Sequence, residues 1–147
     1  MLGFVSLLLM FFLSISSIEE VVEEFHLLET RESEDVFVKN YSLSSQPSIL
    51  AYVCAVEMKQ AKYSFNPIIK LKIFKQTKKK LDSLIESHPA DIHLRYIRLV
   101  LQEKTPVVLG YNDNIEEDKV FLKGKLETAD DSDYLDLYIH NNTSLWQ

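Results

Sequence analysis

The side chains best suited to chemistry lie in two neighbouring stretches, a pair of arginines and an acidic run. Arg95 and Arg98 are three residues apart, a spacing that puts both on one side of a helix. The acidic run, residues 112–118, follows a short return that contains Gly110. Guanidinium groups form strong charge-assisted hydrogen bonds with carboxylates. We therefore expect the two stretches to meet. The contact would be either a set of ion pairs that holds two helices together, which we call the latch, or a small-ligand or enzymatic site.

We favour the latch over the ligand site. The acids occupy a predicted helix start, where the helix dipole stabilises negative charge, and two arginines on an otherwise apolar helix need anionic partners. We expect at least one arginine to donate to one of the three acids that follow Ile115. The candidate residues are Arg95, Arg98, Tyr111, Asn112, Glu116, Glu117 and Asp118.

Other catalytic or metal-binding patterns are weak. The acidic run offers oxygen donors for calcium, but it lacks the glycine and the bidentate acid that a calcium loop places at set positions. His26, His88, His93 and His140 form no helical ligand pair, so we expect isolated surface histidines. No glycine-rich phosphate loop, nucleophile elbow or zinc-protease motif occurs. We expect no catalytic residue, no metal, no cofactor and no enzymatic activity.

Composition indicates one helical domain. The chain has 147 residues, of which 46% are apolar and 26% charged, which suits a folded core. Three glycines and four prolines favour helices over a turn-rich β fold. The net charge of −6 argues against nucleic acid as the main partner. The one cysteine, Cys54, lies between Val53 and Ala55, which is typical of a small buried hydrophobe.

An apolar leader opens the chain. Residues 1–17 carry no charged side chain, and small residues follow the apolar stretch, as in a secretory signal peptide. The stretch is shorter than the roughly 20 residues of a membrane span. A basic residue before it is absent, so an uncleaved anchor or a buried helix is the alternative. We expect an exported protein, periplasmic or envelope-associated, with a helical domain over 18–147 and membrane contact only through an uncleaved leader.

Apolar periodicity predicts six or seven helices. Residues 33–43 also suit a strand, but no partner strand is evident, so we expect a helix there. Asn66 before Pro67 is a helix start, and Asp91 and Asn114 are N-caps, the last with Glu117 as a capping-box partner. The predicted ranges are 18–28, 33–43, 48–63, 67–87, 92–103, 114–127 and 133–140.

The helix at 92–103 is the expected centre of the structure. Its apolar residues cover most of its circumference, and only a narrow stripe is polar, formed by Asp91, Arg95, Arg98 and Gln102. Two helical hairpins of similar size, at about 48–87 and 91–127, follow one another. This succession is typical of helical-repeat proteins.

Two resemblances support helices and export. Leu81 to Pro89, followed by Asp91, resembles the end of a tetratricopeptide repeat, with Pro89 closing the helix, although Leu84 replaces the repeat's small alanine. A second likeness covers about residues 46–127 and looks like an uncharacterised family of small exported bacterial helical proteins. That family implies export and a helical fold, and it implies no activity. The segments that carry it are Ala61 to Pro67, Lys70-Leu71, Phe74, Leu94 to Arg98, Leu109 to Asn112 and the run to Lys119.

A lysine-rich segment leaves one further alternative open. Lys59 to Lys80 contains eight lysines and no acidic residue, which would suit phosphate, anionic lipid or an acidic partner. A solvated helix face is the interpretation we favour. The sequence as a whole predicts an exported, all-α module of antiparallel helical hairpins, like tetratricopeptide repeats, that binds or scaffolds a protein partner.

Overall fold

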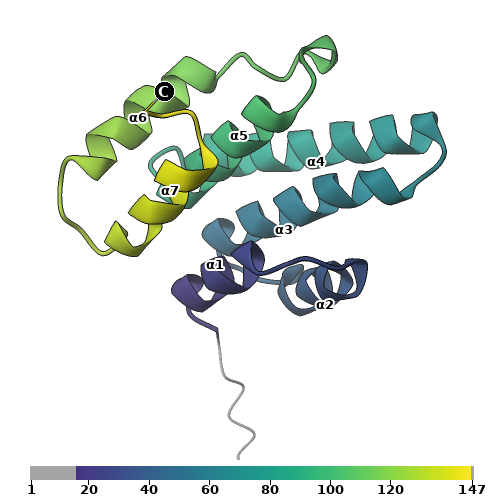
Figure 1. Ribbon diagram of the computed structural model, residues 1–147, viewed down its shortest axis with the longest axis horizontal. Coiled ribbons are helices and arrows are strands. Elements are labelled where there is room, and N and C mark those ends of the chain that lie inside the picture. Colours follow the sequence, from purple (N-terminus) through teal and green to yellow (C-terminus); the bar gives the residue numbers. More distant parts are fainter. Residues whose placement is uncertain (1–15, 147) are drawn as a thin grey trace, which may run out of the picture.

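The described part of the chain is helical throughout. The computed structural model describes residues 16–146, and within them it contains seven α-helices, three short 3-10 helices and no strand (Figure 1). The predicted all-α class with six or seven helices is confirmed. The helices are α1 (Ile18–His26), α2 (Arg31–Tyr41), α3 (Pro47–Gln60), η1 (Ala61–Tyr63), α4 (Pro67–Ser87), α5 (Ile92–Lys104), η2 (Val107–Leu109), α6 (Ile115–Leu126), η3 (Asp133–Leu135) and α7 (Asp136–Asn142).

Two predicted helix starts form as expected. The Asn66 side chain accepts a hydrogen bond from the backbone N–H of Ile68 at 2.9 Å, and Pro67 opens α4. The Asp91 side chain accepts from the backbone N–H groups of His93 and Leu94. Each cap satisfies backbone donors that have no partner inside the helix.

Other predicted helix ends are wrong in detail. The helix predicted to begin at residue 33 begins at Arg31 as α2, where Thr30 is the cap and Ser33 is its partner in a reciprocal capping box. Asn114 makes no capping hydrogen bond to α6, because its backbone is not extended there. Its side chain instead donates to the Glu117 carboxylate at 3.0 Å. The helix predicted to reach residue 63 ends at Gln60 and continues as the 3-10 turn η1.

Two helical hairpins form the body of the fold. α3 packs along α4, and α5 packs along α6 (Figure 1). α3 of the first hairpin also packs on α5 of the second, while α1 and α2 cover another side of α3. α5 therefore lies between α3 and α6, at the centre of the structure, as the sequence predicted for the helix at 92–103.

The core lies along α3 and α5. Both helices bury residues on most of their circumference, including Cys54, Leu94, Ile97 and Leu99, which are fully buried. α4 is different, because it buries only one face and exposes lysines on the other. The predicted burial of Cys54 is confirmed.

The predicted leader, residues 1–17, lies outside the described residues except for its last two positions. Ser17 is the N-cap of α1 and forms a capping box with Glu20. Among the described helices, none is long and apolar enough to span a bilayer.

Truncating Leu99 should destabilise the protein strongly, because its side chain is fully buried in the centre of α5. Leu99→Ala is expected to lower the free energy of unfolding by about 2–5 kcal/mol in a denaturant titration. Leu137→Ala, at a site that is 68% exposed, is the matched control and should change it by less than about 0.5 kcal/mol. Equal effects of the two substitutions would contradict the central position of α5.

Candidate functional site

The two arginines of α5 meet two acids of α6. The Arg98 guanidinium donates two hydrogen bonds of 2.6 Å to the Asp118 carboxylate, Nε to Oδ2 and Nη2 to Oδ1. Arg95 donates through Nη1 to Asp118 Oδ1 at 2.9 Å and also to the Glu117 carboxylate. Asp118 thus receives three hydrogen bonds from two guanidinium groups. This bidentate arrangement ties the middle of α5 to the first turn of α6.

The inner pair, Arg98 with Asp118, is more deeply buried than the outer pair, Arg95 with Glu117. Asp118 is fully buried and Arg98 is 6% exposed, whereas Glu117 is exposed. Burial opposes the charge on Arg98, but its hydrogen bonds with Asp118 and the charge of Asp118 outweigh that effect and raise the pKa of the guanidinium. The hydrogen bonds from Arg95 and Asn114 lower the pKa of Glu117. Arg98 and Glu117 therefore stay charged at neutral pH.

The remaining predicted site residues do not join this cluster. Glu116 and Asn112 are exposed and make no side-chain hydrogen bond or ion pair with another described residue. Tyr111 is buried, but its hydroxyl donates to Asp82 of α4 at 3.4 Å, and its ring packs edge-on against Phe74. Gly110 allows the chain to turn back between α5 and α6, because its φ of 62° lies in the left-handed region that glycine adopts readily.

This cluster has the features of a structural latch. The carboxylate oxygens of Asp118 are already occupied by guanidinium donors, and the carboxylate is closed to solvent. Within the described residues, no group of three or more histidine, cysteine or acidic side chains is placed to hold a metal ion. The arrangement can therefore fix two helices against each other, but it leaves little room for a ligand on Asp118.

Two histidines occupy positions that the sequence did not predict. His93 is 6% exposed, and its two ring nitrogens lie 2.7 Å and 3.0 Å from the hydroxyls of Tyr52 and Tyr134. His26 is half-buried and stacks on Tyr138 with ring centroids 4.2 Å apart. The expectation of isolated surface histidines is therefore wrong for these two. Their tyrosine partners are 41 or more residues away, so no local spacing reveals them.

Both rings are held neutral. Burial disfavours the charged imidazole and lowers the pKa of His93 to about 4, with the charge of Asp91 opposing the shift. Burial and the nearby charge of Lys104 lower the pKa of His26 to about 4. Burial likewise raises the pKa of the Cys54 thiol to about 12, which keeps it protonated and unreactive.

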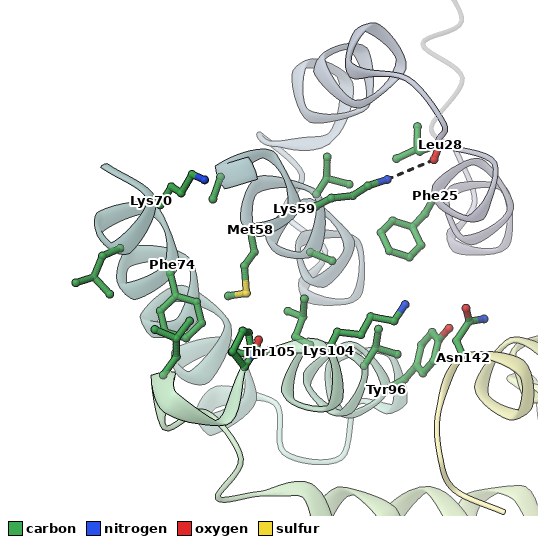
Figure 2. A pocket seen from close by; sticks show the side chains of 18 of the residues that line it. Phe25, Leu28, Met58, Lys59, Lys70, Phe74, Tyr96, Lys104, Thr105 and Asn142 are labelled. Carbon is green, nitrogen blue, oxygen red and sulfur yellow. Dashed lines mark hydrogen bonds between the residues drawn. The ribbon is translucent and has the colours of Figure 1, made fainter. Parts of the chain in front are cut away.

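A mainly apolar groove lies between the helices. It has a volume of about 620 Å³ and lies between α1, α3, α4 and α5 (Figure 2). Its size falls within the roughly 300–1,000 Å³ range of small-ligand sites. We call it the apolar groove; residues that line it include Phe25, Met58, Phe74, Tyr96, Val100 and Leu101.

Polar side chains gather at one end of the apolar groove. Lys59 and Lys104 project near Phe25, Tyr96 and Asn142, while the opposite end is formed by α4 and the turn after α5 (Figure 2). The lining includes three lysines, Lys59, Lys70 and Lys104, and no acidic residue. Nothing in the sequence indicated this feature, because it arises where four helices leave a space that no large side chain fills.

Comparisons of the chain with known protein families, with curated proteins and with solved structures find no match. The resemblances to tetratricopeptide repeats and to an exported bacterial family therefore stay predictions.

The neutral state of His93 should make stability depend on pH. His93 has a pKa of 6.5 in the unfolded chain and about 4 in the folded protein. Between these values the unfolded chain is protonated at His93 and the folded protein is not, so the free energy of unfolding falls as the pH is lowered through this window. The contribution of His93 is on the order of 2–3 kcal/mol. In denaturant titrations at pH 7 and pH 4.5, roughly the ends of the window, His93→Gln should lose less stability on acidification than the parent protein. Exposed His140→Gln should keep the parent's pH dependence. Identical behaviour of the two variants would show that His93 is protonated without cost.

Proposed function

We propose that this protein is an exported binding module and that the apolar groove is its binding site. The groove carries the proposal because it combines a ligand-sized volume, apolar walls and a few polar groups gathered at one end. These are the usual properties of a site that binds a small or elongated apolar guest.

The placement of the reactive side chains supports binding rather than catalysis. Arg98 and Asp118 are occupied with each other, and His93 is held between two tyrosine hydroxyls. Cys54 is buried and protonated. Catalysis by these groups would require an open approach to a substrate.

The protein partner and the repeat-like architecture expected from the sequence are also proposals. The contact of α3 with α5 supports a repeat-like stacking of successive hairpins. A protein partner with an apolar segment would suit the groove. The groove is more polar at the end near Lys104 than at the end near Phe74, and this difference favours a smaller guest. The apolar leader supports export.

Filling the apolar groove should abolish binding of an apolar guest. Met58 projects into the groove and is half-buried, so Met58→Trp should occupy its middle without removing a buried residue (Figure 2). In equilibrium dialysis with 1-aminoanthracene, a neutral aromatic probe, we expect saturable binding to the parent protein. Binding to Met58→Trp should be weaker by about tenfold or more.

The control for this experiment is Val120→Trp, which places the same side chain on an exposed site of α6 that is not part of the groove. It should bind the probe as the parent protein does. Absence of saturable binding to the parent, or equal loss in both variants, would overturn the assignment of the groove.

Export should be visible in the mass of the mature protein. Protein secreted through its native pathway is expected to lack about 16–17 residues, because a signal peptide is removed after the small residues that end its apolar region. Intact-mass spectrometry of the secreted fraction measures this directly. Full-length protein confined to the cytoplasm would contradict export.

A further inference from the structure

We propose that the apolar groove binds a single-chain amphiphile with an anionic head group, such as a long-chain carboxylate. The head group would lie at the end of the groove near Lys104, and the alkyl chain would extend towards Phe74 (Figure 2). This inference rests on the groove being the binding site, and it adds the chemical class of the ligand and its orientation.

The two ends of the groove differ in chemistry. At one end lie polar groups from three helices, with Tyr96, Lys104 and Asn142 visible in Figure 2 and the His26 ring 3.2 Å from the Tyr96 hydroxyl. At the other end the walls are mainly apolar, with Lys70 as the charged residue and Thr105 lying between Phe74 and Lys104 (Figure 2). The apolar residues of this end are Pro67, Leu71, Phe74, Pro106 and Leu109. A guest that is polar at one end and apolar along the rest of its length matches this division.

Exposed apolar residues lie close in sequence to the lining residues of the apolar end. Phe65 and Ile68 lie within two positions of Pro67 and are both largely exposed, and Val107 and Val108, between Pro106 and Leu109, are more than three-quarters exposed. The segments that form the end away from Lys104 therefore also carry exposed apolar surface. This surface would accommodate the far end of an alkyl chain.

The charge of the groove selects an anion. The lining contains Lys59, Lys70 and Lys104 and no acidic residue, although the chain as a whole has a net charge of −6. Lys59 is already neutralised, since its Nζ lies 2.8 Å from the buried carboxylate of Glu34. Lys104 is exposed and forms no ion pair with a carboxylate among residues 16–146. Lys104 is therefore the cation available to a head group at the polar end.

The arrangement favours an amphiphile over an amphipathic helix of a partner protein. A helix lying in a groove presents an apolar stripe along its whole length and polar side chains along both edges. The groove instead has most of its polar side chains at the end near Lys104, with Lys70 and Thr105 as the exceptions. Its volume of about 620 Å³ also suits one small ligand.

Titration calorimetry with three ligands of equal chain length tests the proposal. The probes are dodecanoate, dodecanol and dodecyltrimethylammonium, each added to the full-length protein at a concentration below its aggregation limit. We expect dodecanoate to bind most tightly and the cationic probe to bind at least about tenfold more weakly. Lys104→Glu should weaken dodecanoate binding by about tenfold and leave dodecanol binding within about twofold.

Lys79→Glu is the matched control, because Lys79 is exposed on α4 and is not part of the groove. It makes the same change in net charge and should leave dodecanoate binding within about twofold. Both lysines are exposed, so thermal unfolding is expected to be similar for the two variants.

Several results would overturn the proposal. Equal affinity for all three probes, or equal effects of the two lysine variants, would remove the anionic head group while leaving the groove as an apolar site. Tighter binding of the cationic probe would reverse the assigned charge. Failure of every alkyl probe together with 1-aminoanthracene would overturn the proposed function as well, whereas failure of the alkyl probes alone would overturn only the ligand class.

Discussion

A buried guanidinium and a buried carboxylate are stable only when each has a matched partner, because removing either charge from water is costly. Arg98 and Asp118 meet this condition with two hydrogen bonds of 2.6 Å, and Arg95 adds a third donor. α5 is otherwise apolar on most of its circumference. The pair lets α5 sit at the centre of the core, and it sets where α6 lies along it. The packing of α6 against α5 within the second hairpin depends on this contact.

The groove follows from the same arrangement. The arginine stripe of α5 faces α6, so its other sides are left for α3 and for the groove, which Val100, Leu101 and Lys104 help to line. α3 contributes Met58 and Lys59, and Lys59 is held by Glu34 of α2. The latch and the groove therefore use different sides of one helix. The fold therefore keeps Arg98 and Asp118 in a structural pair and still offers an apolar groove, in which Lys104 is the cation at the polar end.

The sequence predicted what local signals determine. The caps at Asn66 and Asp91 depend on hydrogen bonds to residues two or three positions away, and the burial of α5 follows from its periodicity. The meeting of the arginines with the acidic run followed from charge and a short return. The choice of Asp118 over Glu116 did not, because it depends on how α6 is rotated. The burial of His93 and the groove depend on distant helices, which no local pattern encodes.

A double-mutant cycle on the inner pair tests this account most directly. Arg98→Met and Asp118→Leu, made singly and together, would be compared by denaturant unfolding at neutral pH. The account predicts a coupling free energy of about 2–3 kcal/mol, since each single variant leaves a buried charge without its main partner. Asp118 then keeps only the hydrogen bond from Arg95, and Arg98 keeps only Glu117 at 3.5 Å. The outer pair, in which Glu117 is exposed, should give roughly 0.2–1 kcal/mol for Arg95→Met with Glu117→Gln. Coupling near zero between Arg98 and Asp118 would contradict the central role of the latch.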